Sequence, residues 1–153
     1  MASLAISVAN RFLKGDEVSE VRGLTQGDSR AINFVVGCLF CQAISIAEMK
    51  EWALRLIVEN QVEDIPPYIF DLLDCEESID SVMDAIGFAP DDNEVPTLES
   101  EIYGIAFMRG VDVYDPPISR ADAEKAIRNS PSVMDEFATA FPFIAPVDME
   151  RQN

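Results

Sequence analysis

The side chains with the clearest chemical potential are carboxylates, and they are concentrated in one stretch of the sequence. Between Arg55 and Arg109 there is no Lys, Arg or His, whereas Asp and Glu together occur fourteen times. This is half of the chain's 28 acidic residues. Carboxylates in such numbers can hold a divalent cation, can act as general acid and base, or can attract a positively charged partner.

Binding of a cationic protein is the function that this charge pattern favours. A surface that only needs to be soluble usually mixes both signs of charge, and neighbouring carboxylates repel one another unless a partner neutralises them. Tyr114 joins the predicted surface as an aromatic contact, because it lies between Asp112 and Asp115 in an expected connector. The predicted partner-binding residues are Asp71, Asp74, Glu76, Glu77, Asp80, Asp84, Asp91, Asp92, Glu94, Glu99, Glu101 and Tyr114.

A cation site, a catalytic site and a plain solvated acidic face are the alternatives for these residues. An EF-hand would need alternating ligands, a central glycine and a terminal glutamate, and this spacing does not occur. Acid–base catalysis by two carboxylates needs a cleft that raises the pKa of one of them. The chain also has no histidine, no glycine-rich phosphate loop and no nucleophile elbow. We therefore expect no catalytic residue, no metal ligand and no cofactor.

Cys38 and Cys41 form a CxxC pattern, which in other proteins is a redox motif or half of a zinc site. A redox pair needs an exposed thiolate, whereas these two lie in the most apolar part of the chain. A zinc site needs four ligands, and the only further cysteine is Cys75. We predict that both thiols pack in the core, with redox or metal chemistry as the alternative.

Length and composition indicate a folded acidic protein. At 153 residues the chain is long enough for one domain with a substantial core, and 48% hydrophobic residues argue against disorder. The net charge of −17 would be repelled by nucleic-acid phosphates and by anionic lipids. No signal peptide or membrane span is expected, and three cysteines suit a reducing compartment. We expect a cytoplasmic protein without direct nucleic-acid or membrane binding.

Hydrophobic periodicity predicts helices throughout. The segment from Ala31 to Ile44 is almost entirely apolar and is expected to be the buried central helix, with Asp28 or Ser29 as its cap and a buried strand as the alternative. Ser45 and Glu48 have the spacing of a capping box, and Ser78 and Ser119 are also predicted caps. The expected helices are 3–14, 31–44, one from Ser45, 67–73, one from Ser78 to Gly87, one from Thr97 to Met108, 119–129, and one opened by Ser130 or Ser132.

The predicted fold is all-α, a single compact domain of seven or eight short helices around a central apolar helix. Residues 1–147 are expected to form this helical domain. Residues 15–27, 89–96 and 111–118 are expected to be loops, and residues 148–153 a flexible tail.

The segment SIAEMKEWALRLIVENQVEDIPPYIFDLLD, from Ser45 to Asp74, resembles the small, acidic, helical immunity proteins of bacterial toxin systems, including contact-dependent growth inhibition. The shared features are a capped helix with Glu-Trp-Ala, then a proline and Tyr-Ile-Phe-Asp-Leu. The resemblance implies a non-catalytic protein that binds a cognate toxin, commonly a nuclease, and blocks its active site. A nucleic-acid mimic or acidic adaptor that inhibits a DNA-binding protein is the alternative.

Overall fold

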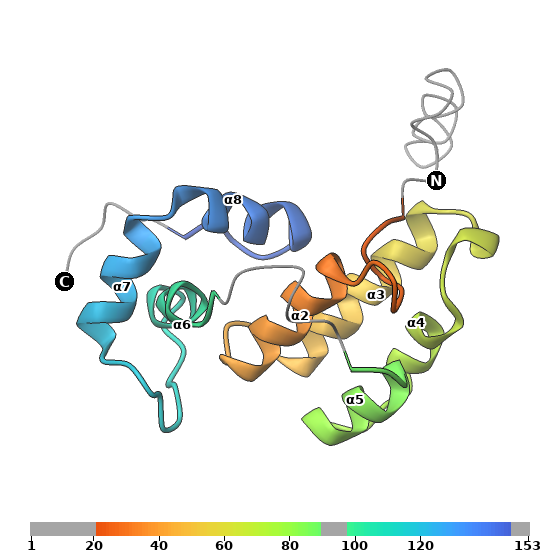
Figure 1. Ribbon diagram of the computed structural model, residues 1–153, viewed down its shortest axis with the longest axis horizontal. Helices are drawn as coiled ribbons and strands as arrows, with labels where there is room; N and C mark the ends of the chain where they lie inside the picture. The colour runs from red at the N-terminus through yellow and green to blue at the C-terminus, as the bar shows by residue number, and fades with distance from the viewer. Residues whose placement is uncertain (1–20, 90–97, 148–153) are drawn as a thin grey trace, which may run out of the picture.

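The computed structural model describes residues 21–89 and 98–147, and in these ranges the chain is helical with no β-strand (Figure 1). The all-α prediction is confirmed. The elements are α2 (Arg30–Phe40), α3 (Ile46–Glu59), the 3-10 helix η2 (Val62–Asp64), α4 (Pro67–Leu72), α5 (Ile79–Ile86), α6 (Glu99–Met108), α7 (Arg120–Arg128) and α8 (Pro131–Ala140). The predicted helix 3–14 and the predicted tail 148–153 lie outside the described residues.

The apolar segment that begins at Ala31 forms the buried helix α2, so the strand alternative is wrong. The helix ends at Phe40 and not at Ile44, because Gln42 adopts a left-handed φ of 65° that stops the helical hydrogen bonding. Ser29 occupies the N-cap position, but its side chain accepts no capping hydrogen bond. Asp28 does not cap the helix either, since its carboxylate accepts a 3.1 Å hydrogen bond from the Gly23 N–H.

Local capping signals place most of the other helices where the sequence predicts them. The Ser45 hydroxyl accepts from the Glu48 N–H at 3.1 Å, and the Ser45 N–H donates to Glu48 Oε1 at 2.9 Å, which is the predicted capping box. Ser78 caps α5 and Ser119 caps α7 in the same position. For α8, Ser130 stands at the N-cap without a side-chain capping bond, and Pro131 is the first helical residue.

The helix α6 is buried on every side over its middle turns. Five consecutive residues, Ile102–Ala106, are buried. Figure 1 shows α6 almost along its axis, with α7 on one side, α2 on the other and α8 nearby, and α6 contacts all three of them. The core is therefore organised around α2 and α6 together and not around α2 alone. Leu98 is the N-cap of α6 and makes no side-chain capping bond, and the predicted cap Thr97 lies outside the described residues.

Gly104 allows α6 and α7 to approach each other very closely. A Cβ atom added at Gly104 would lie 2.3 Å from the Ala123 carbonyl oxygen and 2.7 Å from a methyl group of Ile127. Both neighbours belong to α7, and both residues are fully buried. A backbone oxygen cannot move aside as a flexible side chain can, so only glycine fits at this crossing.

Over the described ranges, no helix combines the length and the apolar character needed to cross a membrane.

We predict that Gly104→Ala lowers the free energy of unfolding by about 3 kcal/mol, because the new methyl group forces α6 and α7 apart. Chemical denaturation at constant temperature measures this change. Gly27→Ala is the matched control, since a Cβ at Gly27 meets no atom within 4 Å, and its stability should change by less than about 0.5 kcal/mol. Equal effects of the two substitutions would contradict the close crossing.

Candidate partner-binding surface

Six of the predicted binding residues lie together on α4, α5 and the turn between them, and all six are exposed. We call this group the α4–α5 acidic surface: Asp71, Asp74, Glu76, Glu77, Asp80 and Asp84. The helices α4 and α5 contact each other, and Figure 1 shows them on the side of α2 that is remote from α7. These six carboxylates therefore face solvent on neighbouring elements, and their role in binding stays a prediction.

The apolar residues of the two helices explain why the carboxylates point outward. Ile69 and Leu72 of α4 and Val82 and Ile86 of α5 are buried, so each short helix has one apolar face on the core. The turn before α5 is held by serine hydroxyls: Ser78 Oγ accepts from the Ser81 N–H at 3.1 Å, and Ser81 Oγ accepts from the Glu76 N–H at 2.8 Å. The acidic side chains are thus fixed on the remaining, solvent-facing side.

Little positive charge compensates this surface. Within the described part of the chain, Lys50 is the one cation in ion-pair distance of the six carboxylates, with its Nζ 3.7 Å from Glu77 Oε2. The same ammonium group donates a 2.8 Å hydrogen bond to the Cys75 carbonyl oxygen. Because this cation is shared with a backbone carbonyl and faces one carboxylate, the surface keeps a strong negative potential.

The remaining described binding residues lie at a different place, near the end of α2. Glu99 and Glu101 are in the first turn of α6, and the Glu99 carbonyl oxygen is 3.9 Å from Cys41 Sγ, one residue beyond α2. Tyr114 lies in the connector between α6 and α7 and is 81% exposed. Asp91, Asp92 and Glu94 lie outside the described residues. The described residues therefore form two groups, the α4–α5 acidic surface and a group beside the α2–α3 connection.

A groove of about 450 Å³ lies at the connection between α2 and α3. Ile79 of α5 lines it, as do Arg109 and Val111 at the end of α6. Its floor is the connection between α2 and α3, where Gln42 supplies the polar amide and Ile44 an apolar side chain. The predicted binding residues do not line the groove themselves, but two of its lining residues are next to them: Ile79 precedes Asp80 in α5, and the Gln42 amide is hydrogen-bonded to the backbone of Tyr114.

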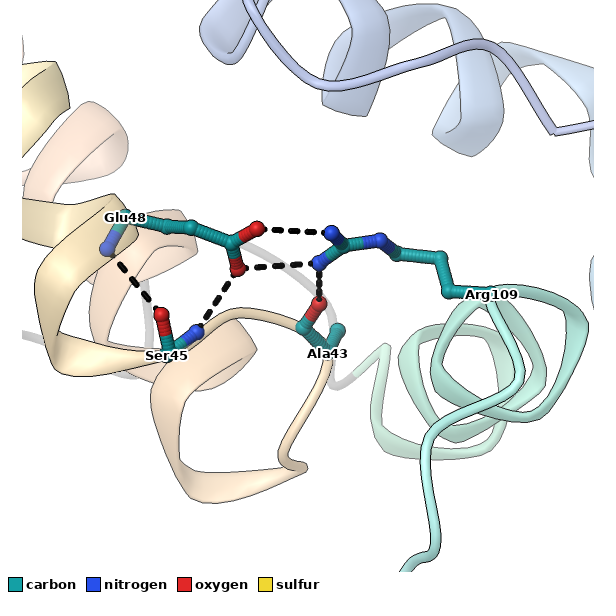
Figure 2. A network of polar contacts seen from close by, with 4 residues as sticks. All are labelled: Ala43, Ser45, Glu48 and Arg109. Carbon is teal, nitrogen blue, oxygen red and sulfur yellow. Dashed lines mark hydrogen bonds and ion pairs between the residues drawn. The ribbon is translucent and has the colours of Figure 1, made fainter.

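One wall of the groove is an ion pair built on the capping box of α3 (Figure 2). Arg109 Nη2 is 2.7 Å from Glu48 Oε2, and Nη1 is 3.0 Å from Oε1. Arg109 Nη1 also donates to the Ala43 carbonyl oxygen. The two side chains are 19% and 28% exposed, so the pair is partly shielded from water. The hydrogen bonds from Arg109 and Ser45 lower the pKa of Glu48 below its ordinary value of 4.5, although partial burial acts in the opposite direction.

The thiols of the CxxC pattern are buried, as predicted. Burial is the main cause that raises the pKa of Cys38, and it raises the pKa of Cys41 to about 12. Both groups are therefore protonated thiols at neutral pH, which is unlike a reactive redox pair. In the ranges 21–89 and 98–147, no group of three or more His, Cys, Asp or Glu side chains is arranged to hold a metal ion.

Two residues of the groove were not singled out from the sequence as site residues, Gln42 and Arg109. Gln42 is a polar residue within an apolar run, and this polarity is the sequence feature that could have identified it as a site residue. Arg109 is the cation that closes the acidic stretch, but its partner Glu48 is 61 residues away, and no sequence pattern connects them.

No protein-family model, no curated protein and no solved structure matches this chain.

We predict that Arg109→Met lowers the free energy of unfolding by about 2 kcal/mol, because it leaves the partly buried Glu48 carboxylate without its charged donor. The matched control is Arg120→Met. Arg120 is 58% exposed and pairs with Glu124 within one helix, so its loss should cost about 0.5 kcal/mol. Urea denaturation of both variants measures the difference, and equal costs would show that the Arg109 pair is no stronger than a surface pair.

The lowered pKa of Glu48 predicts a pH dependence. The Glu48 carboxylate stabilises the fold only when it is deprotonated. Its contribution to stability is therefore complete at pH values above its ordinary pKa of 4.5, and it is lost as the pH falls through the lower pKa of the folded protein. The stability difference between the natural protein and Glu48→Gln should therefore be constant near pH 7 and should shrink in this acidic range. Denaturation curves of both proteins from about pH 7 to about pH 3 measure it. A difference that stays constant would contradict the assignment.

Proposed function

We propose that this protein is a non-catalytic inhibitor that binds one cationic protein domain through the α4–α5 acidic surface and the adjoining groove. On the resemblance of its Ser45–Asp74 segment, the partner is a cognate bacterial toxin, a nuclease, that is neutralised in the cytoplasm. The observation that carries the proposal is a group of six exposed carboxylates that faces a single lysine within the described residues.

Electrostatics explains why a nuclease suits this surface. A nuclease needs a positively charged groove to hold phosphates, and an acidic protein can occupy that groove and exclude the nucleic acid. Opposite potentials also accelerate association, which matters for an inhibitor that must act before the toxin does.

The segment that carries the resemblance contributes directly to this surface. It forms α3, η2 and α4, and its last residues include Asp71 and Asp74. The helix α3 also supplies Lys50 and the Glu48 wall of the groove. The segment therefore supplies two of the six carboxylates of the α4–α5 acidic surface, and the other four follow it directly in the chain.

A nucleic-acid mimic or acidic adaptor is the second candidate, because a row of exposed carboxylates can also imitate phosphates. The two candidates differ in breadth of binding. A mimic binds several unrelated DNA-binding proteins, whereas an immunity protein binds its cognate toxin.

The test is co-purification with the toxin domain encoded beside its gene, followed by charge reversal. We expect Asp74→Lys with Asp80→Lys to weaken binding at low salt by about tenfold, mainly through slower association. The matched control is Asp122→Lys with Asp135→Lys on α7 and α8. It changes the net charge equally, and Asp122 occupies the first turn of α7 as Asp80 does in α5.

The control pair should weaken binding by no more than about twofold, because the long-range field falls equally in both variants and only the local contacts differ. Surface plasmon resonance at two salt concentrations measures both rates. Equal losses for the two pairs would overturn the assignment of the α4–α5 acidic surface, and absence of any complex would overturn the proposed function.

A further inference from the structure

The end of α2 is closed by an unusual residue for its conformation. The Gln42 N–H donates to the Leu39 carbonyl at 3.1 Å, and the Ala43 N–H donates to the Cys38 carbonyl at 2.8 Å. These are the two hydrogen bonds of a Schellman motif, in which the left-handed position is normally glycine. At this position Gln42 has a φ of 65°, which is unfavourable for a residue with a side chain.

The end of α6 shows the same motif with the usual residue. There Gly110 has a φ of 81°. The Gly110 N–H donates to the Phe107 carbonyl oxygen at 3.0 Å, and the Val111 N–H donates to the Ala106 carbonyl oxygen at 3.1 Å. Glycine would therefore serve equally well to end α2. The turn alone gives no reason for glutamine at position 42, so the role of this residue lies in its side chain.

That side chain holds the backbone of Tyr114. Gln42 Nε2 donates to the Tyr114 carbonyl oxygen at 2.9 Å, and the Tyr114 N–H donates to Gln42 Oε1 at 2.8 Å. The side-chain amide of Gln42 thus binds both the N–H and the carbonyl oxygen of Tyr114, which lies 72 residues later in the chain. This clamp fixes the backbone of Tyr114 while the phenol ring is 81% exposed.

The surroundings of the ring are acidic. Asp112 and Asp115 are exposed on either side of Tyr114, and Asp115 has a left-handed φ of 49°. The backbone of Glu99 lies near the same turn, since its carbonyl oxygen is 3.9 Å from Sγ of Cys41, the neighbour of Gln42. The pKa of Tyr103 is raised mainly by burial and next by Cys41. Glu99 and Asp115 raise it further, so both carboxylates lie near the Tyr103 side chain. The nearest groove cation, Arg109, is already bound by Glu48.

We propose that Tyr114 is a preformed anchor that receives a lysine or arginine side chain of the cationic partner. The face of the phenol ring attracts the cation, and Asp112 and Asp115 provide the complementary charge. The inference rests on the proposed function for the identity of the partner, but it concerns a separate contact, on the α6–α7 connector and not on the α4–α5 acidic surface.

The clamp explains how an exposed ring in a connector can contribute to affinity. Ordering a loop residue during binding costs conformational entropy, which subtracts from the affinity. In this protein Gln42 orders the backbone before the partner arrives. The unfavourable φ at Gln42 is tolerated in the free protein because the amide gains two hydrogen bonds.

The test uses the full chain and a nona-arginine peptide as a model cation, followed by NMR of backbone amides and tyrosine rings at low salt. We expect the peptide to shift the Tyr114 ring signals, and Tyr114→Ala to weaken peptide binding by about two- to fivefold. Val62→Ala is the matched control, because Val62 is also largely exposed, and it should bind as the natural protein does.

Gln42→Gly tests the clamp separately from the fold. Glycine suits the left-handed turn, so the thermal midpoint should stay the same or rise, while hydrogen exchange at the Tyr114 N–H accelerates and peptide affinity falls. Unchanged exchange would overturn the clamp, and unchanged affinity of Tyr114→Ala would overturn the anchor. If the ring binds the peptide but the neighbouring toxin does not co-purify, the proposed function fails and the anchor stands.

Discussion

The bidentate pair between Arg109 and Glu48 is the interaction on which the arrangement of the helices depends. It joins the end of α6 to the beginning of α3, and its third contact, to the Ala43 carbonyl, adds the end of the α2–α3 connection (Figure 2). Arg109 is therefore fixed to two neighbouring points of the chain, which precede it by 61 and 66 residues. Glu48 also completes the capping box with Ser45. The same carboxylate therefore caps its own helix and binds an arginine from a distant part of the chain. The groove between α5 and the α6–α7 connector takes its shape from this point.

The distribution of cations explains why the acidic stretch keeps its charge. The arginines of the described chain are largely engaged near their own helices: Arg55 lies 3.2 Å from Glu51, and Arg120 lies 2.6 Å from Glu124. Arg109 is used in the groove wall. Such local pairing leaves one lysine for the carboxylates of α4 and α5, so the negative potential is a consequence of how the fold uses its few bases.

Features that depend on residues three or four positions apart were predictable from the sequence. Ser45 with Glu48 and Ser119 with Asp122 marked the starts of α3 and α7, because a capping hydrogen bond is decided by neighbours in the chain. The end of α2 was not predictable, since Gln42 is stabilised in its left-handed conformation by Tyr114. The burial of α6 on all sides also depends on tertiary contacts, which override its own periodicity.

The close crossing of α6 and α7 at Gly104 has a consequence for how binding specificity can change. The two helices form a tight unit, so the ends of the connector between them, from Gly110 to Ser119, are held at fixed positions. A loop with anchored ends can accept new side chains at its tip without altering the core beneath it. The connector that carries Tyr114 is therefore a region where related proteins could diversify, with each sequence selecting a different partner on an unchanged helical framework.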